Sequence, residues 1–513
     1  MNAPTQANPN RWWTLAAVVI ATFMLLLDIT IVNVALPQIQ KDFHANFSDL
    51  QWVIDAYALS LAALQLTSGS IADIRGRKLV FMVGLGLFTA ASFLCGLANS
   101  PTFLNVARGL QGVGGAMMFA TSLALLAAAF TGRERGTAFG IWGAAIGGSV
   151  AIGPLIGGAI TDGLGWQWIF FVNVPIGIAA ILFTQRKVDE SRNPNARSVD
   201  WPGLVVWSAG LFLLVLALIR GNEQGWGSTK TVVELAAAVA LIIAFLVLES
   251  RRREPMLELS LFRKPAFAGV SIVAFTLSAS MFAMFLYLTL YLQNGLHLTP
   301  LETGVRFLPL TVLSFFVAGA AGRLVHSVPA RVLFAIGLGA VGLGLLLMHG
   351  ITPESNWTTL LPGFIAAGAG IGLVNPTIAQ VAVGVVSPER SGMAAGINNT
   401  FRQVGIATGI AGLGAIFQGR IESKASALLT ASGMPGPEAH NVAHAVATQR
   451  AGSGGGGAVA RAAQLSFISA LNEILMVACV IAFTGAVLGA LLVRSSDFAH
   501  GAEQASEPAP AAA

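Results

Sequence analysis

Long apolar runs recur along almost the whole chain, and each one is long enough to cross a membrane. About 20 apolar residues in a helix span the roughly 30 Å of hydrocarbon in a bilayer. The runs are continuous and do not alternate with polar residues, which excludes β-strands as the spanning element. The sequence predicts fourteen helical spans, at about 13–33, 51–72, 79–98, 103–127, 136–160, 168–185, 201–219, 231–249, 266–292, 304–322, 331–350, 359–384, 395–417 and 467–493.

The composition of the chain supports this prediction. Of its 513 residues, 55% are hydrophobic and only 10% are charged, whereas soluble domains carry about 25% charged residues. The net charge is +5, and the basic residues are dispersed between the apolar runs, which argues against a nucleic-acid partner. Cys95 and Cys479 both lie in apolar runs, so neither a disulfide framework nor a thiolate metal site is expected. The chain is predicted to be an all-α polytopic membrane protein.

Lysine and arginine are distributed unequally between the two sides of the predicted bundle. Nineteen of the 29 basic residues fall on the side of the N-terminus, whereas the opposite short loops hold only Lys41, Arg220 and Lys230. Cytoplasmic loops of membrane proteins carry an excess of these residues. Both termini are therefore expected in the cytoplasm. The first run follows a short polar start and lacks a small-residue cleavage site, so it is expected to be retained as a signal anchor.

Polar interruptions divide the predicted helices into groups. A six-helix bundle at 12–186 is followed by two helices at 200–250 and by a second six-helix bundle at 266–494. The segment GRERGTAFGIW (132–142) is echoed by SPERSGMAAGINN (387–399). Such an echo indicates a parallel repeat of two six-helix halves, as in membrane transporters, although coincidence between two Gly/Ala-rich stretches is the alternative.

A long external loop at 418–465 differs in kind from the other connections. It contains a predicted short helix, PEAHNVAHAVATQ, in which His440 and His444 stand four residues apart. This spacing can place two imidazoles on one metal ion, but no third ligand is evident, and a solvated helix face explains it better. The tail at 498–513 is rich in Ala, Pro and Glu and is predicted to be disordered.

The sequence contains no motif of an ATP-driven pump or a membrane enzyme. The phosphate-binding pattern GxxxxGK[ST] is absent. Gly337, Gly339 and Gly342 match GxGxxG, but they lie inside an apolar span with no strand before them, so helix packing through small residues explains them better. Zinc-protease and nucleophile-elbow patterns are also absent. The chain is not expected to be an enzyme, and no metal or other cofactor is expected.

Charged residues inside the predicted spans are the most informative ones. Asp28 lies in the middle of the first span, Asp55 in the outer part of the second, Arg108 in the fourth and Arg402 in the thirteenth. At that depth a charge costs at least about 2.5–3.5 kcal/mol, so each residue must face a cavity or a partner. Asp28 and Arg108 form either a static ion pair or a proton site, because burial disfavours a charged carboxyl while a nearby guanidinium favours it. For Asp55 a solvated or capping role is an equal alternative.

Three segments make the chain resemble a known family. LDITIVNVALPQI (27–39) and WQWIFFVNVPIG (166–177) are similar to signatures of the fourteen-helix drug:proton antiporter branch of the major facilitator superfamily, and ARGLQGVGGA (107–116) resembles its helix 4 arginine motif. The resemblance implies two six-helix bundles plus two extra helices. It also implies a proton-coupled exporter of amphipathic drugs or related small molecules in the bacterial cytoplasmic membrane. The alternatives are an exporter of one endogenous lipid or metabolite, and a receptor or channel of transporter ancestry.

Two further motifs carry the resemblance to individual residues. The cytoplasmic loop 2–3 motif of the superfamily, which implies a conformational switch, is matched by Gly69, Asp73, Gly76, Arg77 and Lys78. Ile74 departs from it, since a basic residue often follows the aspartate. The antiporter motif of helix 5 is matched by Gly140, Gly153, Pro154, Gly157 and Gly158, with Ser149 where glycine is usual. Glycine and proline permit close helix contact and a bend.

The resemblance also implies roles in coupling and in substrate binding. Asp28 is expected to be the main coupling carboxylate, with Arg108 as its modulator and Asp55 as the next candidate. Polarizable and aromatic side chains suit apolar ligands of variable shape, although in membrane helices they usually face lipid or core. The candidates are Met24, Met117, Met118, Phe119, Met281, Met284, Phe285, Tyr287 and Tyr291. The expected partners are a small-molecule substrate, protons as the coupling ion and membrane lipids, and the chain is expected to act as a monomer.

Overall fold

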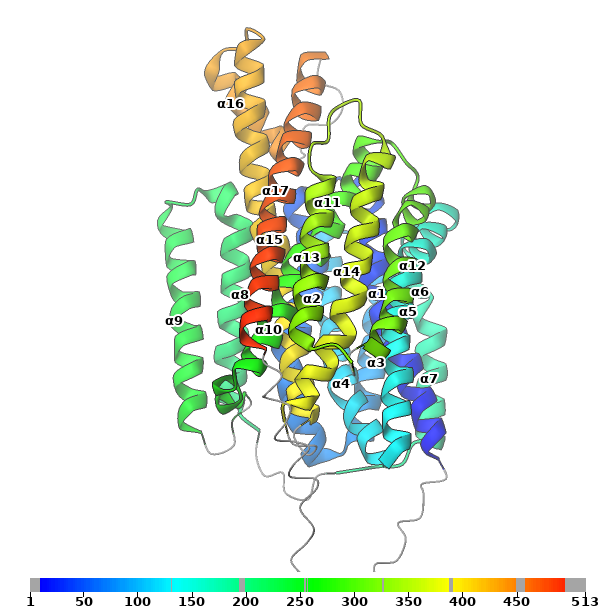
Figure 1. Cartoon of the computed structure of the whole chain (residues 1–513). Helices are drawn as coiled ribbons and strands as arrows, with labels where there is room; N and C mark the ends of the chain where they lie inside the picture. Colours follow the sequence, from blue (N-terminus) through cyan, green and yellow to red (C-terminus); the bar gives the residue numbers. More distant parts are fainter. Residues whose placement is uncertain are drawn as a thin grey trace, which may run out of the picture.

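The described residues form one bundle of roughly parallel helices (Figure 1). The computed structural model describes residues 10–130, 132–192, 199–252, 255, 257–324, 327–386, 391–448 and 457–493. In this part of the chain every regular element is a helix. The fold class is therefore confirmed as all-helical.

The first six predicted spans are all helical. The sixth is interrupted after one short turn, so the N-terminal half consists of α1 (Arg11–Phe43), α2 (Phe47–Arg75), α3 (Arg77–Gly96), α4 (Pro101–Ala129), α5 (Gly132–Gly163), α6 (Trp168–Phe171) and α7 (Asn173–Lys187).

Polar residues between the apolar runs fix where these helices begin. Asn46 and Asp49 form a capping box at the start of α2, in which the Asn46 side chain accepts from the Asp49 N–H at 2.9 Å and the Asp49 carboxylate accepts from the Asn46 N–H at 3.1 Å. α4 begins with Pro101 directly after Ser100, whose hydroxyl accepts from the Phe103 N–H at 3.3 Å.

The C-terminal half has the same number of long helical segments, but its first span is not a uniform α-helix. One π-helical turn lies in the middle of this span, and a second π-helical turn ends it. The half comprises the short η1 (Leu259–Arg263), then α10 (Pro265–Leu277), η2 (Ser278–Phe282), α11 (Ala283–Leu290), η3 (Tyr291–Gly295), α12 (Pro300–Leu324), α13 (Ala330–Met348), η4 (Trp357–Leu360), α14 (Leu361–Gly384), α15 (Ser391–Ala431), α16 (Gly436–Ala447) and α17 (Gly457–Leu492).

The two extra helices, α8 (Trp201–Gln224) and α9 (Thr229–Arg251), lie at one side of the bundle (Figure 1). α8 contacts α2 of one half and α15 of the other, and α9 packs mainly on α8. An ion pair of 3.2 Å between Arg252 and the buried Asp200 joins the end of α9 to the start of α8. The pair α8–α9 therefore covers one edge of the contact between the halves.

The two halves meet along two pairs of helices. α5 of the N-terminal half packs on α12, and α2 packs on α15. α5 is bent by 40° between Thr137–Ile146 and Ala151–Gly163. Pro154 explains the bend, because it has no N–H for the carbonyl of the residue four positions earlier and its ring displaces that carbonyl.

The described residues contain twelve helices that are long and apolar enough to cross a membrane, or thirteen if the two parts of α5 form one span. The remaining predicted span coincides with α2, a 29-residue helix in the same bundle. Gln51, Asp55 and Gln65 lower the mean hydropathy of α2. All fourteen predicted spans are thus helical segments, while fourteen crossings remain a prediction.

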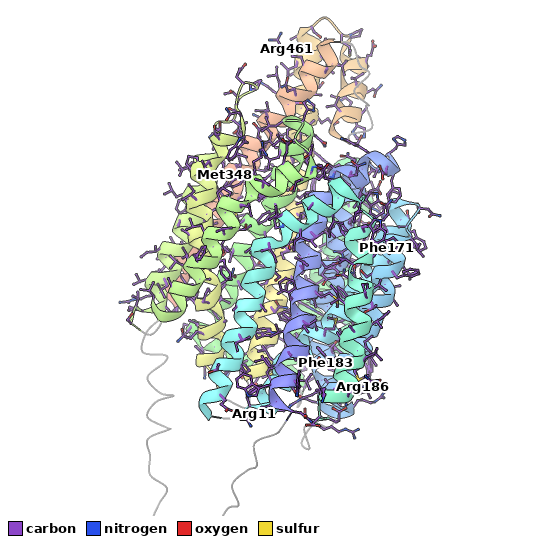
Figure 2. All side chains as sticks on the ribbon, turned by 90° about the vertical axis from the view of Figure 1, so that its right-hand side faces the viewer. Arg11, Phe171, Phe183, Arg186, Met348 and Arg461 are labelled. Atoms are coloured by element: carbon purple, nitrogen blue, oxygen red, sulfur yellow. The ribbon has the colours of Figure 1, made fainter. Side chains whose placement is uncertain are left out.

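The region predicted as an external loop at 418–465 is more helical than expected. α15 continues to Ala431, α17 already begins at Gly457, and the predicted short helix is α16. These segments project beyond the other helices (Figure 1). Figure 2 places Arg461 of this projection at the end of the bundle opposite Arg11 and Arg186. The tail at 498–513 lies outside the described residues.

Candidate functional site

Asp28 of α1 and Arg108 of α4 are in direct contact in the interior of the N-terminal half. The Arg108 Nη1 donates to Asp28 Oδ2 at 2.5 Å, and the side chains of both residues are only 1% exposed. The same guanidinium donates through Nε to the Val53 carbonyl at 3.0 Å and through Nη1 to Gln111 Oε1 at 2.7 Å. It also lies over the Tyr57 ring, 4.3 Å from the centroid. Arg108 is thus held by α1, α2 and its own helix.

Two amide side chains complete the surroundings of Asp28. Gln111 Nε2 and Asn173 Nδ2 both donate to Asp28 Oδ1, at 2.9 and 3.0 Å. Both amides also donate to the Ser92 hydroxyl, at 3.2 and 3.0 Å, and Ser92 itself donates to the Phe170 carbonyl at 2.9 Å. Sequence reasoning did not identify Ser92 and Asn173 as parts of the site. Asn173 lies within the signature segment at 166–177 but was not singled out there, and the only signal for Ser92 was a polar residue inside an otherwise apolar segment.

Every hydrogen-bonding group described around Asp28 is a donor. Such surroundings match a carboxylate, which only accepts, and do not match a neutral carboxyl, whose O–H needs an acceptor. A proton on Asp28 would remove the charge that attracts Arg108 and would bring its O–H against N–H groups. Protonation therefore weakens contacts that join α1, α4 and α7.

Asp55 lies in different surroundings. It is completely buried, and neither carboxyl oxygen has a hydrogen-bond partner among the described residues. One turn away on α2, Gln51 Nε2 donates to the Ile410 carbonyl of α15 at 3.0 Å, and the Tyr287 hydroxyl of α11 donates to the same carbonyl at 2.7 Å. Residues four apart share a helix face. Asp55 therefore lies along the contact between the two halves, separate from the Asp28–Arg108 pair.

The residues of the loop 2–3 motif bind one another and the end of α7. Arg77 donates to Asp73 Oδ1 through Nε at 2.9 Å and through Nη2 at 2.8 Å. Gly76 has a φ of 121°, and a Cβ there would lie 2.7 Å from the Glu190 carboxylate. Glu190 accepts from the N–H groups of Lys78 and Leu79, at 2.9 and 3.1 Å. These contacts stay within the N-terminal half and cap the start of α3.

The antiporter motif of α5 lies where helix backbones approach closely. Gly157 faces the backbone of α1, because a Cβ there would lie 3.0 Å from the Ile31 Cα. Gly158 faces α12 of the opposite half, since a Cβ there would lie 2.9 Å from the Leu301 Cα. From the other side, a Cβ on Gly304 would meet the backbone of Pro154 and, at 3.1 Å, the Leu155 Cα. Sequence reasoning missed Gly304.

The remaining motif residues differ in how closely neighbouring helices approach them. A Cβ on Gly153 would overlap the side chain of Thr30 on α1, whereas a Cβ on Gly69 would meet no atom within 4 Å. Ser149, which replaces the usual glycine, is buried and donates to the Ile146 carbonyl of its own helix at 2.8 Å. Gly140 lies in the first part of α5. A serine is accommodated at position 149 because its hydroxyl is satisfied within the helix.

The predicted substrate-binding residues do not come together in one place. Met24, Met118 and Phe119 belong to a hydrophobic cluster of the N-terminal half. A second cluster contains Met281, Met284, Phe285, Tyr287 and Tyr291. Met117 is partly exposed and packs beside Gly84 of α3. Substrate contact by these residues stays a prediction.

A carboxylate that the sequence did not indicate, Glu422 of α15, lies beside the two histidines of α16. His440 Nε2 and His444 Nδ1 each lie 3.6 Å from a Glu422 carboxylate oxygen. Within the described ranges no group of three His, Cys, Asp or Glu residues is arranged to hold a metal ion. The three side chains are exposed to different degrees and fasten α16 to α15.

Two helical halves with ionisable groups buried between their helices define a membrane transporter. The comparisons with known proteins agree. A model of the Major Facilitator Superfamily matches residues 18–410. The chain belongs to this superfamily. It is a transporter related to drug-resistance and efflux proteins and not an enzyme, and it fits the fourteen-helix branch that its motifs resemble.

Two relatives and one solved structure illustrate the relationship. The Multidrug resistance protein Stp of Mycobacterium tuberculosis is 38% identical over 410 residues, which cover 80% of this chain and 76% of that protein. The Puromycin resistance protein pur8 of Streptomyces alboniger is 37% identical over 418 residues, covering 80% and 83%. The crystal structure of a bacterial homologue of the human lysosomal transporter Spinster, inward-facing and unoccupied, is 19% identical with a TM-score of 0.57, covering 95% and 99%. This last similarity concerns the fold alone.

Proposed function

We propose that the chain is a proton-coupled secondary active exporter of amphipathic drugs or related small molecules in the bacterial cytoplasmic membrane. The observation that carries the proposal is the buried Asp28–Arg108 pair, because its carboxylate joins three helices through contacts that depend on its charge. The relationship to drug-resistance proteins supports the exporter direction. The substrate and the proton bind to the protein in different steps of the transport cycle, as alternating access requires.

In this mechanism the charge of Asp28 decides which conformation is stable. The deprotonated carboxylate holds Arg108, Gln111 and Asn173 together and keeps α1, α4 and α7 in one arrangement. Protonation releases that arrangement. The two halves then separate at one end of the contacts α5–α12 and α2–α15. Before this separation, Gly158 and Gly304 allow α5 and α12 to lie in close contact. Loss of the proton on the other side of the membrane restores the first state.

The energy of the proton gradient is sufficient for this work. A charge moved through about 150 mV yields about 3.4 kcal/mol. That corresponds to a concentration ratio of a few hundred for each charge moved. Asp55 is proposed as a second protonation site, because its buried carboxyl lies on α2 at the contact between the halves.

A dedicated exporter of one lipid or metabolite is the second candidate. One relative is named for multidrug resistance and the other for puromycin alone, so related chains bear both kinds of name. Broad resistance of an efflux-deficient host that expresses the chain supports the multidrug reading. Resistance to a single compound supports the dedicated exporter.

The proposed topology has fourteen crossings with both termini in the cytoplasm. Ser250 at the end of α9 and Ser432 after α15 are exposed and suit labelling. In a variant without Cys95 and Cys479, Ser250→Cys should react with an impermeant maleimide only in inverted vesicles, and Ser432→Cys only in intact cells. Labelling of both from the same side would overturn the count.

The function is tested with a pair of xanthene dyes in inverted membrane vesicles. Rhodamine 110 carries a free carboxylate, and rhodamine 123 is its methyl ester; they are called the acid dye and the ester dye below. Vesicles with an acidified lumen should accumulate at least one of them, and an uncoupler should abolish the accumulation. Accumulation that persists with the uncoupler would contradict proton coupling, and accumulation of neither dye would contradict the export function.

A further inference from the structure

The C-terminal half contains a positive charge, Arg402 of α15, that has no negative charge nearby among the described residues. Its helical segments α10, α11, α13 and α14 contain no Asp or Glu. Glu302 starts α12 and lies 3.8 Å from Arg306, and Glu473 of α17 lies 2.8 Å from Arg420. Glu422, the only acid of α15, is some 20 residues beyond Arg402, which is about 30 Å along a helix. The acids of these helices are thus remote from Arg402 or already engaged.

Arg402 has no counter-ion in the part of the chain that the structure describes. Among the described residues, no carboxylate lies within 4 Å of its guanidinium. The guanidinium lies over the Phe282 ring, with its Cζ 5.8 Å from the ring centroid. The residue is partly exposed. Charged residues inside membrane helices are expensive and normally pair with a partner or face a substrate path. Arg402 therefore lacks the partner that would offset its cost.

The residue that faces Arg402, Phe282, belongs to a π-helical turn between α10 and α11. Phe282 ends the π-helical turn η2, and its ring lies 6.1 Å from that of Phe285. In the same turn the buried Ser278 hydroxyl has no hydrogen-bond partner among the described residues. π-helical turns inside α-helices occur frequently at functional sites. The Phe282 ring, with Ser278 in the same π-helical turn, thus lies on the side of the guanidinium.

Further unsatisfied donors lie on and beside α15. Asn398 is one turn before Arg402 on the same helix face, is 4% exposed, and its Nδ2 has no acceptor. Asn399 donates to Gln65 Oε1 of α2 at 2.6 Å, and the Nε2 of the buried Gln65 has no acceptor among the described residues. Buried N–H groups are satisfied in nearly all native structures. Donors without acceptors beside an unpaired cation indicate that an acceptor-rich ligand belongs here.

We propose that Arg402, with Asn398 beside it, binds an ionised acid group of the substrate, and that the aromatic body of the substrate lies against Phe282. The substrate class is therefore an aromatic or amphipathic compound with a carboxylate or phenolate. Guanidinium groups bind such oxygens through charge-assisted hydrogen bonds. This inference rests on the proposed export function and assigns recognition to the C-terminal half, away from Asp28.

The dye pair tests this inference because the two dyes differ only in the free carboxylate. Binding of each dye to the purified full-length protein in detergent is measured by fluorescence polarisation, for the wild type, Arg402→Gln and Arg402→Lys. Arg420→Gln is the matched control, since Arg420 lies on the same helix but is paired with Glu473 at its external end. Arg402→Gln should raise the dissociation constant of the acid dye about tenfold or more and that of the ester dye less than about threefold. Arg402→Lys should give a smaller loss for the acid dye, and Arg420→Gln should change neither constant.

Three results would overturn the inference. They are failure of the wild type to bind the acid dye, equal losses for both dyes in Arg402→Gln, and the same loss in Arg420→Gln. Proton-driven accumulation of the ester dye by wild-type vesicles, seen together with any of these, would leave the export function standing. Loss of proton-driven accumulation of both dyes in the wild type would instead refute the export function.

Discussion

The two six-helix halves hold the charges inside their helices in opposite ways. In the N-terminal half, Asp28 accepts hydrogen bonds from Arg108, Gln111 and Asn173, and the pair is closed to solvent. In the C-terminal half, Arg402 is partly exposed and has no carboxylate within 4 Å among the described residues. The charge of Asp28 is paired within the N-terminal half, whereas the charge of Arg402 has no partner among the described residues. In our account, the N-terminal half senses protons and the C-terminal half recognises the substrate.

The Asp28 site and the Arg402 site respond to different events. A carboxylate surrounded by donors changes its contacts when a proton arrives, without any ligand. An unpaired guanidinium gains its partner only when an anion enters. Because the halves touch along α5–α12 and α2–α15, a change in one is transmitted to the other by packing. The predictions below test whether proton sensing and substrate recognition are separated between the two halves.

The largest expected effect is on folding stability. Arg108→Ala leaves the buried Asp28 carboxylate without its counter-ion, and breaking one partner of a buried pair costs about 3–5 kcal/mol. Arg402→Ala removes a charge that has no partner, so it should leave the free energy of unfolding unchanged or raise it. Unfolding in mixed micelles with increasing SDS measures both. Equal destabilisation by the two substitutions would abolish the contrast between the halves.

The contact between the halves gives the next effect. Gly158→Leu places a side chain against the backbone of α12, and Gly304→Leu does the same against α5. Each should lower proton-driven dye accumulation by about tenfold or more, because overpacking costs about 1–3 kcal/mol. Gly148→Leu is the control on α5, since a Cβ there meets no atom within 4 Å. Normal transport by Gly158→Leu, with the protein present in the membrane, would show that close approach is not needed.

A smaller effect is expected from the second donor to Asp28. Asn173→Ala removes a hydrogen bond that stabilises the charged carboxylate. The contacts that join α1, α4 and α7 should then be weaker, and proton-driven dye accumulation should fall by about fivefold. Ser92→Ala should give a smaller loss, because Ser92 contacts Gln111 and Asn173 but not Asp28. Accumulation by Asn173→Ala equal to that of the wild type would contradict the role given to this contact.

The smallest effect is expected at the departure from the antiporter motif. Ser149→Gly removes a hydroxyl that bonds within its own helix. The cost should stay below about 1 kcal/mol. Dye accumulation should remain within twofold of the wild type. A strong loss would give Ser149 a role of its own in the N-terminal half.

Much of the fold follows from the sequence, since each apolar run of sufficient length became a helix. α2 was predicted as well, although its buried Gln51, Asp55 and Gln65 lower its mean hydropathy. The differences from the prediction have local physical causes. The extension of α15 to Ala431 rests on packing against α16 and α17, which a window of residues does not reveal.

The site was predicted less completely than the fold. Asp28 and Arg108 are recognisable because a charge inside an apolar run needs a partner. Asn173 and Ser92 are small polar residues that membrane helices tolerate at many positions, so only the three-dimensional arrangement assigns them to the site. The lack of a counter-ion at Arg402 is equally invisible in sequence, because it depends on which helices surround α15. Contacts between distant segments decide these roles.

The most direct test of the account is proton-driven transport by Asp28→Asn. In inverted vesicles with an acidified lumen, the wild type should accumulate dye against its gradient. Asp28→Asn should not, although it should still exchange internal for external dye, because asparagine mimics the neutral carboxyl. Accumulation by Asp28→Asn equal to that of the wild type would contradict the account and would make Asp55 the next candidate for coupling.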